Sequence, residues 1–215
     1  MKKKNATILL NKQTRDYEIV SDDARNWKIV ANRFIPRGEA VTPKGSTAWI
    51  LCEPSQYIEI ELRETGETKT VLPHVHAVPV DDSCVPLGLE LPWCFANHSC
   101  NPNTFDFWDE KDPESLVASE IVACRDICKG EELTFDYCLE QYQYLHSFNC
   151  GCNQQNCRGH VSGFQGLSVQ EQTRLFDKIS PFVRRRHLEA ATASNMTLLT
   201  SVGNCESASA VGPKY

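Results

Sequence analysis

Three cysteines crowd into the stretch "NCGCNQQNCRGH", where Cys150, Cys152 and Cys157 are separated by short turns. This spacing allows one tight segment to bring three sulfur atoms within reach of a single metal ion. Thiolate ligands favour zinc over harder cations. A structural zinc site has four ligands, so the stretch predicts a metal knuckle with a remote fourth ligand or an open position.

The interpretation of all 11 cysteines depends on the compartment in which the chain folds. The N-terminal "MKKKNATILLNKQ" has an apolar stretch too short for a signal peptide, and no small-residue cleavage site follows it. No apolar run of the sequence approaches membrane-spanning length. We therefore expect an intracellular protein, nuclear or cytoplasmic, whose clustered cysteines bind metal and whose scattered cysteines are core residues.

A chain of 215 residues is long enough for one domain with a sizeable core and a tail. Up to about residue 163 its pattern is mainly that of strands and turns. "YIEIELRETGETKTVL" alternates apolar and polar residues around Thr65-Gly66, which predicts a hairpin. "NTFDFWDEKDPESLVASEIVAC" predicts two more strands around an acidic turn, and "ELTFDY" predicts another. The expected fold class is mostly β.

The segments "FIPRGEAV" and "DICKGEEL" share the pattern Ile-x-basic-Gly-Glu. Gly38 and Gly130 would each supply a permissive backbone for a turn that enters a strand. Two unrelated turns are the simpler explanation of this similarity.

The C-terminal part has a different character. In "LSVQEQTRLFDKISPFVRRRHLEA", Ser168 and Glu171 form a capping-box pattern, and Pro181 should kink or restart the helix. We expect a helical segment over 165–190 and a flexible tail over 191–215, where residues are small and polar. The net charge of −6 disfavours nonspecific nucleic-acid binding and is compatible with a lysine-rich partner.

Three motifs occur in the order "NHSCNPN", "GEELTFDY" and "CGCNQQNCRG". Together they resemble the SET-domain methyltransferases with a post-SET zinc site, over roughly residues 6–160. The resemblance implies a SET domain at 6–140, a post-SET segment at 146–160, and small sheets with a knot-like C-terminal threading. It further implies S-adenosylmethionine as cofactor and a protein lysine, for example in a histone tail, as methyl acceptor. Neither direct nucleic-acid binding nor a membrane is expected.

The resemblance also supplies a fourth zinc ligand. In this family it is the cysteine of the "NHSC" motif, here Cys100, which would close a structural site of four cysteines. A zinc ion completed by His146 or His160 is the alternative, because either residue is near enough in sequence.

The family's catalytic roles fall on three aromatic residues. By similarity, Tyr137 is the active-site tyrosine, whose hydroxyl would orient the amine and the methyl group. Phe135 matches the position that sets product state, and phenylalanine there implies di- or trimethylation. Tyr57 matches an aromatic residue that lines the lysine channel.

Other positions match the family's cofactor site. Asn97 and His98 match the pair that contacts the adenine end of the cofactor, partly through backbone groups. Phe148 matches a position that lines the cofactor.

The chain departs from the family pattern in two places. Asn26, Trp27 and Lys28 align with a cofactor-binding Gly-x-Gly segment, but both glycines are absent. The arginine that commonly precedes the "FxNHSC" motif is missing, since Trp93 and Cys94 stand there. These departures keep two alternatives open: a SET-fold enzyme that acts on a small molecule, and a noncatalytic SET-like binding module.

Overall fold

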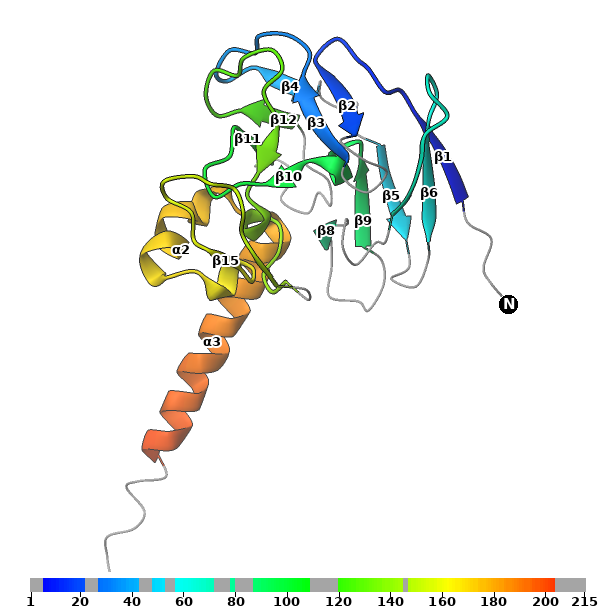
Figure 1. Ribbon diagram of the computed structural model, residues 1–215. Coiled ribbons are helices and arrows are strands. Elements are labelled where there is room, and N and C mark those ends of the chain that lie inside the picture. The colour runs from blue at the N-terminus through cyan, green and yellow to red at the C-terminus, as the bar shows by residue number, and fades with distance from the viewer. Residues whose placement is uncertain are drawn as a thin grey trace, which may run out of the picture.

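The computed structural model is built mainly from short strands in several small sheets, with the α-helices gathered at the C-terminal end (Figure 1). It describes residues 6–21, 27–42, 48–52, 57–71, 78–79, 87–108, 120–144 and 147–203. Asn26 and His146 therefore lie outside the described residues. The expected mostly β fold class is confirmed.

The strands are β1 (Ala6–Leu10), β2 (Tyr17–Ser21), β3 (Trp27–Ala31), β4 (Ala40–Thr42), β5 (Ala48–Cys52), β6 (Ile58–Leu62), β7 (Thr68–Val71), β8 (Val78–Pro79), β9 (Leu87–Leu91), β10 (Asn97–His98), β11 (Thr104–Phe107), β12 (Glu120–Ala123), β13 (Thr134–Phe135), β14 (Phe148–Asn149) and β15 (His160–Val161). The helices are η1 (Trp93–Phe95), η2 (Tyr137–Leu139), η3 (Phe164–Gly166), α2 (Val169–Leu175), η4 (Phe176–Lys178) and α3 (Pro181–Gly203). The sheets have the strand orders β1-β6-β7, β2-β3, β4-β12-β11, β5-β9-β8, β10-β13 and β14-β15.

The expected hairpin and the two further expected strands are confirmed. Strands β6 and β7 pair antiparallel across a turn in which Gly66 has a φ of +69°. Strands β11 and β12 also pair antiparallel, and β12 continues the sheet to β4. Period-two alternation in the sequence therefore located these strand pairs correctly.

The similarity between the two Ile-x-basic-Gly-Glu segments corresponds to a structural pair. Gly38 and Gly130 have the same φ of +84°, a left-handed conformation that favours glycine. The backbones of Ile35 and Ile127 exchange two hydrogen bonds of 2.9 Å. The two turns thus lie side by side, and they are not unrelated.

Apolar residues form two buried clusters. The larger one is made by the sheets and includes Ile19, Ile29 and Ile60, each 0% exposed. The smaller one joins Leu139, which follows β13, to apolar residues of the C-terminal segment such as Phe164 and Val183. The C-terminal segment is therefore docked onto the chain just beyond the "TFDY" motif.

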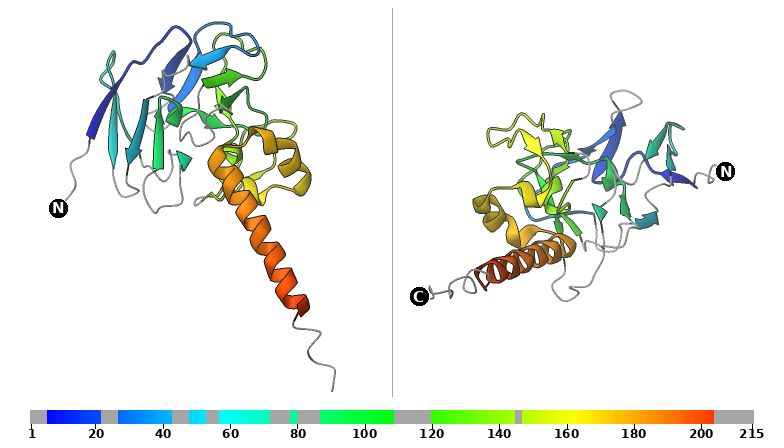
Figure 2. Two further views of the ribbon diagram at one scale, coloured as in Figure 1. Left: turned by 180° about the vertical axis from the view of Figure 1, so that it is seen from behind. Right: turned by 90° about the horizontal axis from the view of Figure 1, so that it is seen from below.

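The helical segment ends later than the sequence indicated. Ser168 and Glu171 form the expected capping box of α2, and Pro181 begins α3. Helix α3 then continues to Gly203, beyond the expected end at residue 190, and extends away from the sheets (Figures 1 and 2). The segment that suggested a tail also contains alanine, leucine and methionine, which favour a helix. Within the described part of the chain, no helix has both the length and the apolar character required to cross a membrane.

Candidate functional site

The first two motifs meet through a short parallel pair of strands. Strand β10 pairs with β13 in the register Asn97↔Thr134 and His98↔Phe135. The backbone N–H of Ser99 extends this pairing by donating to the Phe135 carbonyl at 3.0 Å. Segments separated by more than thirty residues in the sequence thus form one surface.

The buried amide of Asn103 holds this junction together. Its Oδ1 accepts the backbone N–H of Thr134 at 2.8 Å, while its Nδ2 donates to the Glu132 carbonyl at 2.8 Å. The residue is 1% exposed, so these bonds satisfy a polar group that would be costly to bury unpaired. "NHSCNPN" therefore contributes a structural clamp in addition to the predicted cofactor pair.

A cavity of about 770 Å³ opens beside the junction. This volume falls in the range of sites for small ligands and cofactors. Its walls combine motif residues, aromatic rings and part of the cysteine knuckle. The lining includes Asn97, His98, Tyr137, Tyr144, Phe148 and Cys150.

Tyr137 lies at the cavity wall in the first turn of η2. Its hydroxyl donates to the Ala96 carbonyl at 2.9 Å, across the strand junction. Burial raises the pKa of Tyr137 well above its ordinary value, with nearby Tyr144 and Cys94 adding to the effect. The phenol therefore remains protonated at neutral pH, and it can orient a partner more readily than it can act as a base.

His98 connects Tyr137 to the cysteine cluster. Its Nδ1 accepts the backbone N–H of Tyr137 at 3.2 Å, and its Nε2 lies 3.3 Å from Cys100 Sγ. Burial lowers the pKa of His98 to about 4, although the neighbouring Asp136 carboxylate opposes this shift. The imidazole is thus neutral near pH 7, and acceptance at Nδ1 assigns its proton to Nε2, directed at the sulfur.

Aromatic rings surround the Tyr137 side chain. Phe135 lies 4.8 Å from it and Phe148 lies 6.1 Å from it, measured between ring centroids. Tyr144 stacks on it at 6.0 Å with an interplanar angle of 16°. The motif comparison did not single out Tyr144, whose only sequence signal is the concentration of aromatic residues just before the knuckle.

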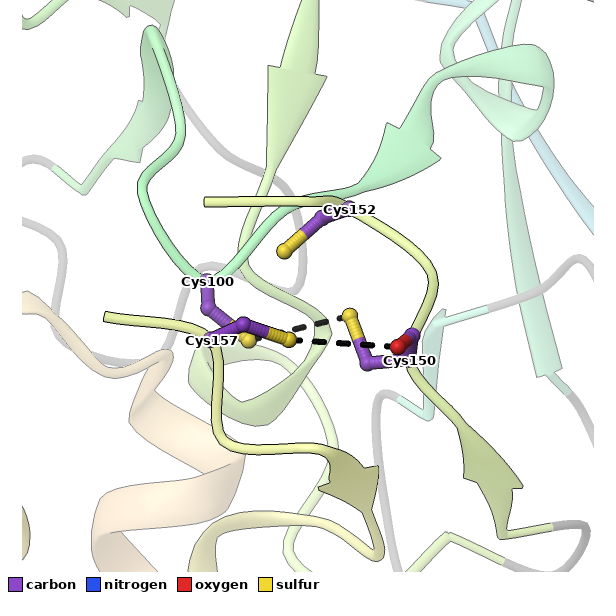
Figure 3. Close-up of side chains that lie close together, drawn as sticks. All are labelled: Cys100, Cys150, Cys152 and Cys157. Atoms are coloured by element: carbon purple, nitrogen blue, oxygen red, sulfur yellow. Dashed lines mark hydrogen bonds between the residues drawn. The ribbon is translucent and has the colours of Figure 1, made fainter. Parts of the chain in front are cut away.

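The four predicted metal ligands come together. The Sγ atoms of Cys100, Cys150, Cys152 and Cys157 all lie within 4.8 Å of one another and point toward a common centre (Figure 3). All four are free cysteines, and His160 instead contacts Asn149. The cluster is a suitable donor set for a thiophilic cation.

The pKa values of three cysteines in the cluster are shifted from the ordinary value of a thiol. Burial raises the pKa of Cys100 above its ordinary value and raises that of Cys150 to about 12. Burial also opposes ionisation of Cys152, but hydrogen bonds from the backbones of Cys100 and Gln154 help to lower the pKa of Cys152 to about 6. A bound divalent cation would replace the shared protons and stabilise all four thiolates.

Other predicted site residues do not line this cavity. Trp27 is 3% exposed, and its ring packs against Phe95 at 5.0 Å in the sheet core. Lys28 is half-buried in β3, and Tyr57 is 53% exposed beside β6. The structure therefore brings Asn97, His98, Tyr137 and Phe148 together around the cavity. Trp27, Lys28 and Tyr57 lie outside the cavity lining, and the roles predicted for them stay predictions.

Comparison with known families identifies the fold. The family model described as "SET domain" matches residues 26–138, which are 113 of the 215 residues. The chain belongs to the SET-domain family.

Two relatives illustrate the range of similar proteins. The chain is 41% identical over 70 residues to the histone-lysine N-methyltransferase, H3 lysine-36 specific, of Saccharomyces cerevisiae. That match covers 32% of this chain and 9% of the yeast protein. A match to methyltransferase flvH of Aspergillus flavus is 31% identical over 101 residues and covers 46% of this chain and 51% of that protein. This chain therefore spans only part of these relatives.

Solved structures give more distant matches. A structure described as KRYPTONITE in complex with mCHH DNA, H3(1-15) peptide and SAH is 22% identical, with a TM-score of 0.39. The alignment covers 67% of this chain and 29% of that one. A putative histone methyltransferase of Plasmodium falciparum is 14% identical with a TM-score of 0.36, over 58% of this chain and 95% of the other.

Proposed function

We propose that this chain is an S-adenosylmethionine-dependent methyltransferase that modifies a lysine amine of a protein. One observation carries the proposal: Asn97, His98, Tyr137 and Phe148 line a single cavity of cofactor size. Family membership supports the same reaction. The bound cofactor would supply an electrophilic methyl group on a sulfonium centre.

The cavity chemistry suits this cofactor. The amide of Asn97 donates from Nδ2 to Glu132 Oε1 at 2.7 Å, so its side chain is already oriented beside the cavity. Phe148 lines the cavity with an apolar ring, and His98 lines it with an uncharged imidazole. These residues would hold the cofactor while leaving its methyl group accessible.

Tyr137 would orient the acceptor amine. In-line displacement needs a neutral amine, a straight approach and a polar contact that is organised before reaction. A protonated phenol that donates to Ala96 keeps oxygen lone pairs available to accept a hydrogen bond from that amine. The proton of the lysine ammonium leaves to solvent, because the phenol cannot accept it.

The cysteine cluster would hold one zinc ion. Four thiolates complete a tetrahedral shell, which makes the site structural. The ion would tie the knuckle to the "NHSC" strand beside the cavity, and thus stabilise the cavity wall.

A histone is the first substrate to test, because several relatives are named for histone methylation. It would imply a nuclear location. A small-molecule acceptor is the second candidate, because the flvH match covers more of this chain and the name of that relative states no protein substrate.

The test compares Tyr137→Phe with the matched control Tyr142→Phe. Tyr142 packs against the C-terminal apolar cluster and does not line the cavity. Purified proteins are incubated with radiolabelled S-adenosylmethionine and either histones or a small-molecule extract. We expect Tyr137→Phe to lower kcat on the order of a hundredfold with cofactor affinity unchanged, and the control to retain its rate.

Equal rates for both variants on a confirmed lysine substrate would show that Tyr137 has no role in transfer. Label transfer to a small molecule alone would support the second candidate. Absence of transfer to either acceptor class, together with absence of cofactor binding by calorimetry, would indicate the binding module.

A further inference from the structure

Arg158 follows the last cysteine of the knuckle and reaches from it into the protein interior. Its backbone N–H donates to Cys100 Sγ at 3.4 Å. Its side chain is only 11% exposed, which is unusual for an arginine at a metal knuckle's surface. The same residue therefore touches a metal-ligand sulfur and enters the region beneath the knuckle.

The Arg158 guanidinium forms a buried ion pair with Asp136. Nη2 donates to Asp136 Oδ2, and the Asp136 side chain is 4% exposed. Neither partner of a buried pair can be removed without leaving the other charge poorly solvated. The contact should consequently be maintained whenever the knuckle is in place.

Asp136 in turn controls the start of η2. Its Oδ1 accepts the backbone N–H of Cys138 at 3.1 Å, which makes it the N-cap of the turn. Tyr137 is the first residue of that turn. A displaced Asp136 carboxylate would therefore alter the backbone that sets the direction of the Tyr137 ring.

A second carboxylate supports the arginine from the C-terminal segment. Glu171 Oε1 lies 3.9 Å from Arg158 Nε, and Glu171 is itself held in the capping box of α2. Three segments thus converge on one guanidinium: the knuckle, the turn that carries Tyr137, and the first turn of α2.

We propose that Arg158 is a positioning residue that couples the metal-bound shape of the knuckle to the orientation of Tyr137 through Asp136. The proposal rests on the function proposed above for its kinetic consequence. Its structural consequence, a coupling between the metal site and turn η2, is independent of that function. Arg158 is not among the residues that line the cavity, so it would act on the reaction only through other residues.

The test uses Arg158→Gln, the conservative Arg158→Lys, and Arg15→Gln as the control for loss of one positive charge. The Arg15 side chain is 80% exposed. Three quantities are measured for each protein: zinc per chain, kcat and KM for the cofactor and acceptor, and amide hydrogen exchange at Tyr137 and Cys138. Exchange is measured with metal bound and again after chelation.

We expect Arg158→Gln to keep its zinc and to lower kcat by about tenfold, with KM for the cofactor changed by less than about twofold. Exchange at the two amides should accelerate about tenfold in the metal-bound variant, because the cap carboxylate has lost its partner. Arg158→Lys should recover part of both effects, since an ammonium group keeps the positive charge beside Asp136 but lacks the separate Nη2 and Nε groups with which Arg158 approaches Asp136 and Glu171. Arg15→Gln should match the parent protein.

Chelation provides the decisive comparison. In the parent protein, metal removal should accelerate exchange at Cys138, whose amide is capped by Asp136, whereas in Arg158→Gln it should add little at this amide, because Asp136 has already lost its partner. The Tyr137 amide is bonded to His98, which contacts Cys100, so it can respond to the metal in both proteins. Equal acceleration at Cys138 in both proteins would overturn the proposal. Loss of zinc from both Arg158 variants would also overturn it, by assigning the residue to metal retention alone.

If the parent protein transfers no methyl group, the exchange comparison still decides whether the coupling exists. Failure of the proposed function and failure of the coupling are therefore separate outcomes.

Discussion

The β10–β13 junction and the β2–β3 hairpin are held together in different ways. At the junction, distant segments are joined by polar side chains such as Asn103, Asp136 and Arg158. In the hairpin, Trp27 and Ile29 bury apolar surface in the sheet core. Polar bonds are directional whereas apolar packing is not, so the junction can fix atomic positions where the hairpin mainly supplies stability.

This difference separates one departure from the family pattern from the candidate site. The hairpin lacks the Gly-x-Gly segment, yet the Trp27 ring packs in the core against Phe95 and does not line the cavity. The junction, in contrast, retains the "NHSCNPN" and "GEELTFDY" motifs. Substitutions in the two regions should therefore have separable effects on stability and on the site.

The largest effect is expected from Cys100→Ser at the junction. A serine oxygen is a much poorer zinc ligand than a thiolate, so affinity for the ion should fall by about a hundredfold or more. Elemental analysis after dialysis against a weak chelator measures the loss. Cys128→Ser, at an exposed free cysteine, is the control, and tight full occupancy in Cys100→Ser would show that another residue completes the site.

Trp27→Ala tests the hairpin. Removing a fully packed indole should lower the free energy of unfolding by about 3–5 kcal/mol. If Trp27 only packs, a more conservative Trp27→Phe variant should bind the cofactor with a Kd close to that of the parent, as measured by calorimetry. A strong loss of affinity in folded Trp27→Phe would instead assign this position to the cofactor site.

Asn103→Ala tests the junction without touching a metal ligand. It leaves the partly buried backbone N–H of Thr134 and the Glu132 carbonyl without their amide partner, at a cost of about 3 kcal/mol. Denaturant unfolding measures the loss, and cofactor affinity should fall with it because β10 and β13 separate. Unchanged affinity in the folded variant would mean that the cavity does not depend on this clamp.

Acid sensitivity should arise in part from His98. Its pKa in the folded state is about 4, below the ordinary value of 6.5, so the unfolded chain binds more protons between these pH values. Stability is consequently full above pH 6.5 and is lost as pH falls toward 4, by about 3 kcal/mol from this residue. The His98→Gln variant should show a shallower slope in unfolding experiments with excess zinc, and an identical slope would contradict this assignment.

The smallest effect is expected outside the two compared strand pairs, at the cap of α2. Ser168→Ala removes the acceptor for the Glu171 backbone N–H and should cost about 1 kcal/mol of stability. The melting temperature measures the loss. Thr173→Ala, which removes a hydroxyl from inside the same helix, is the control and should not lower the melting temperature. A change in cofactor affinity in Ser168→Ala would reveal that α2 influences the cavity through Glu171 and Arg158.

Local sequence signals determined much of this fold. Alternation predicted the β6–β7 and β11–β12 pairs, and Ser168, Glu171 and Pro181 correctly marked the helix boundaries at their N-terminal ends. These features depend on residues close together in sequence, whose backbone preferences act before any distant contact forms. The predicted end of the helical segment at residue 190 was wrong, because the composition that follows it is compatible with both a tail and a helix.

The sequence also predicted part of the candidate site, since motif order supplied Cys100, His98 and Tyr137, which the structure brings together. Only the tertiary structure decided that Tyr144 stacks on Tyr137, that the Trp27 ring enters the core, and that Arg158 reaches Asp136. Each of these contacts depends on the direction of a side chain after two segments have docked. Spacing along the chain carries no information about that direction, because it is set by packing and hydrogen bonding with residues that are remote in sequence.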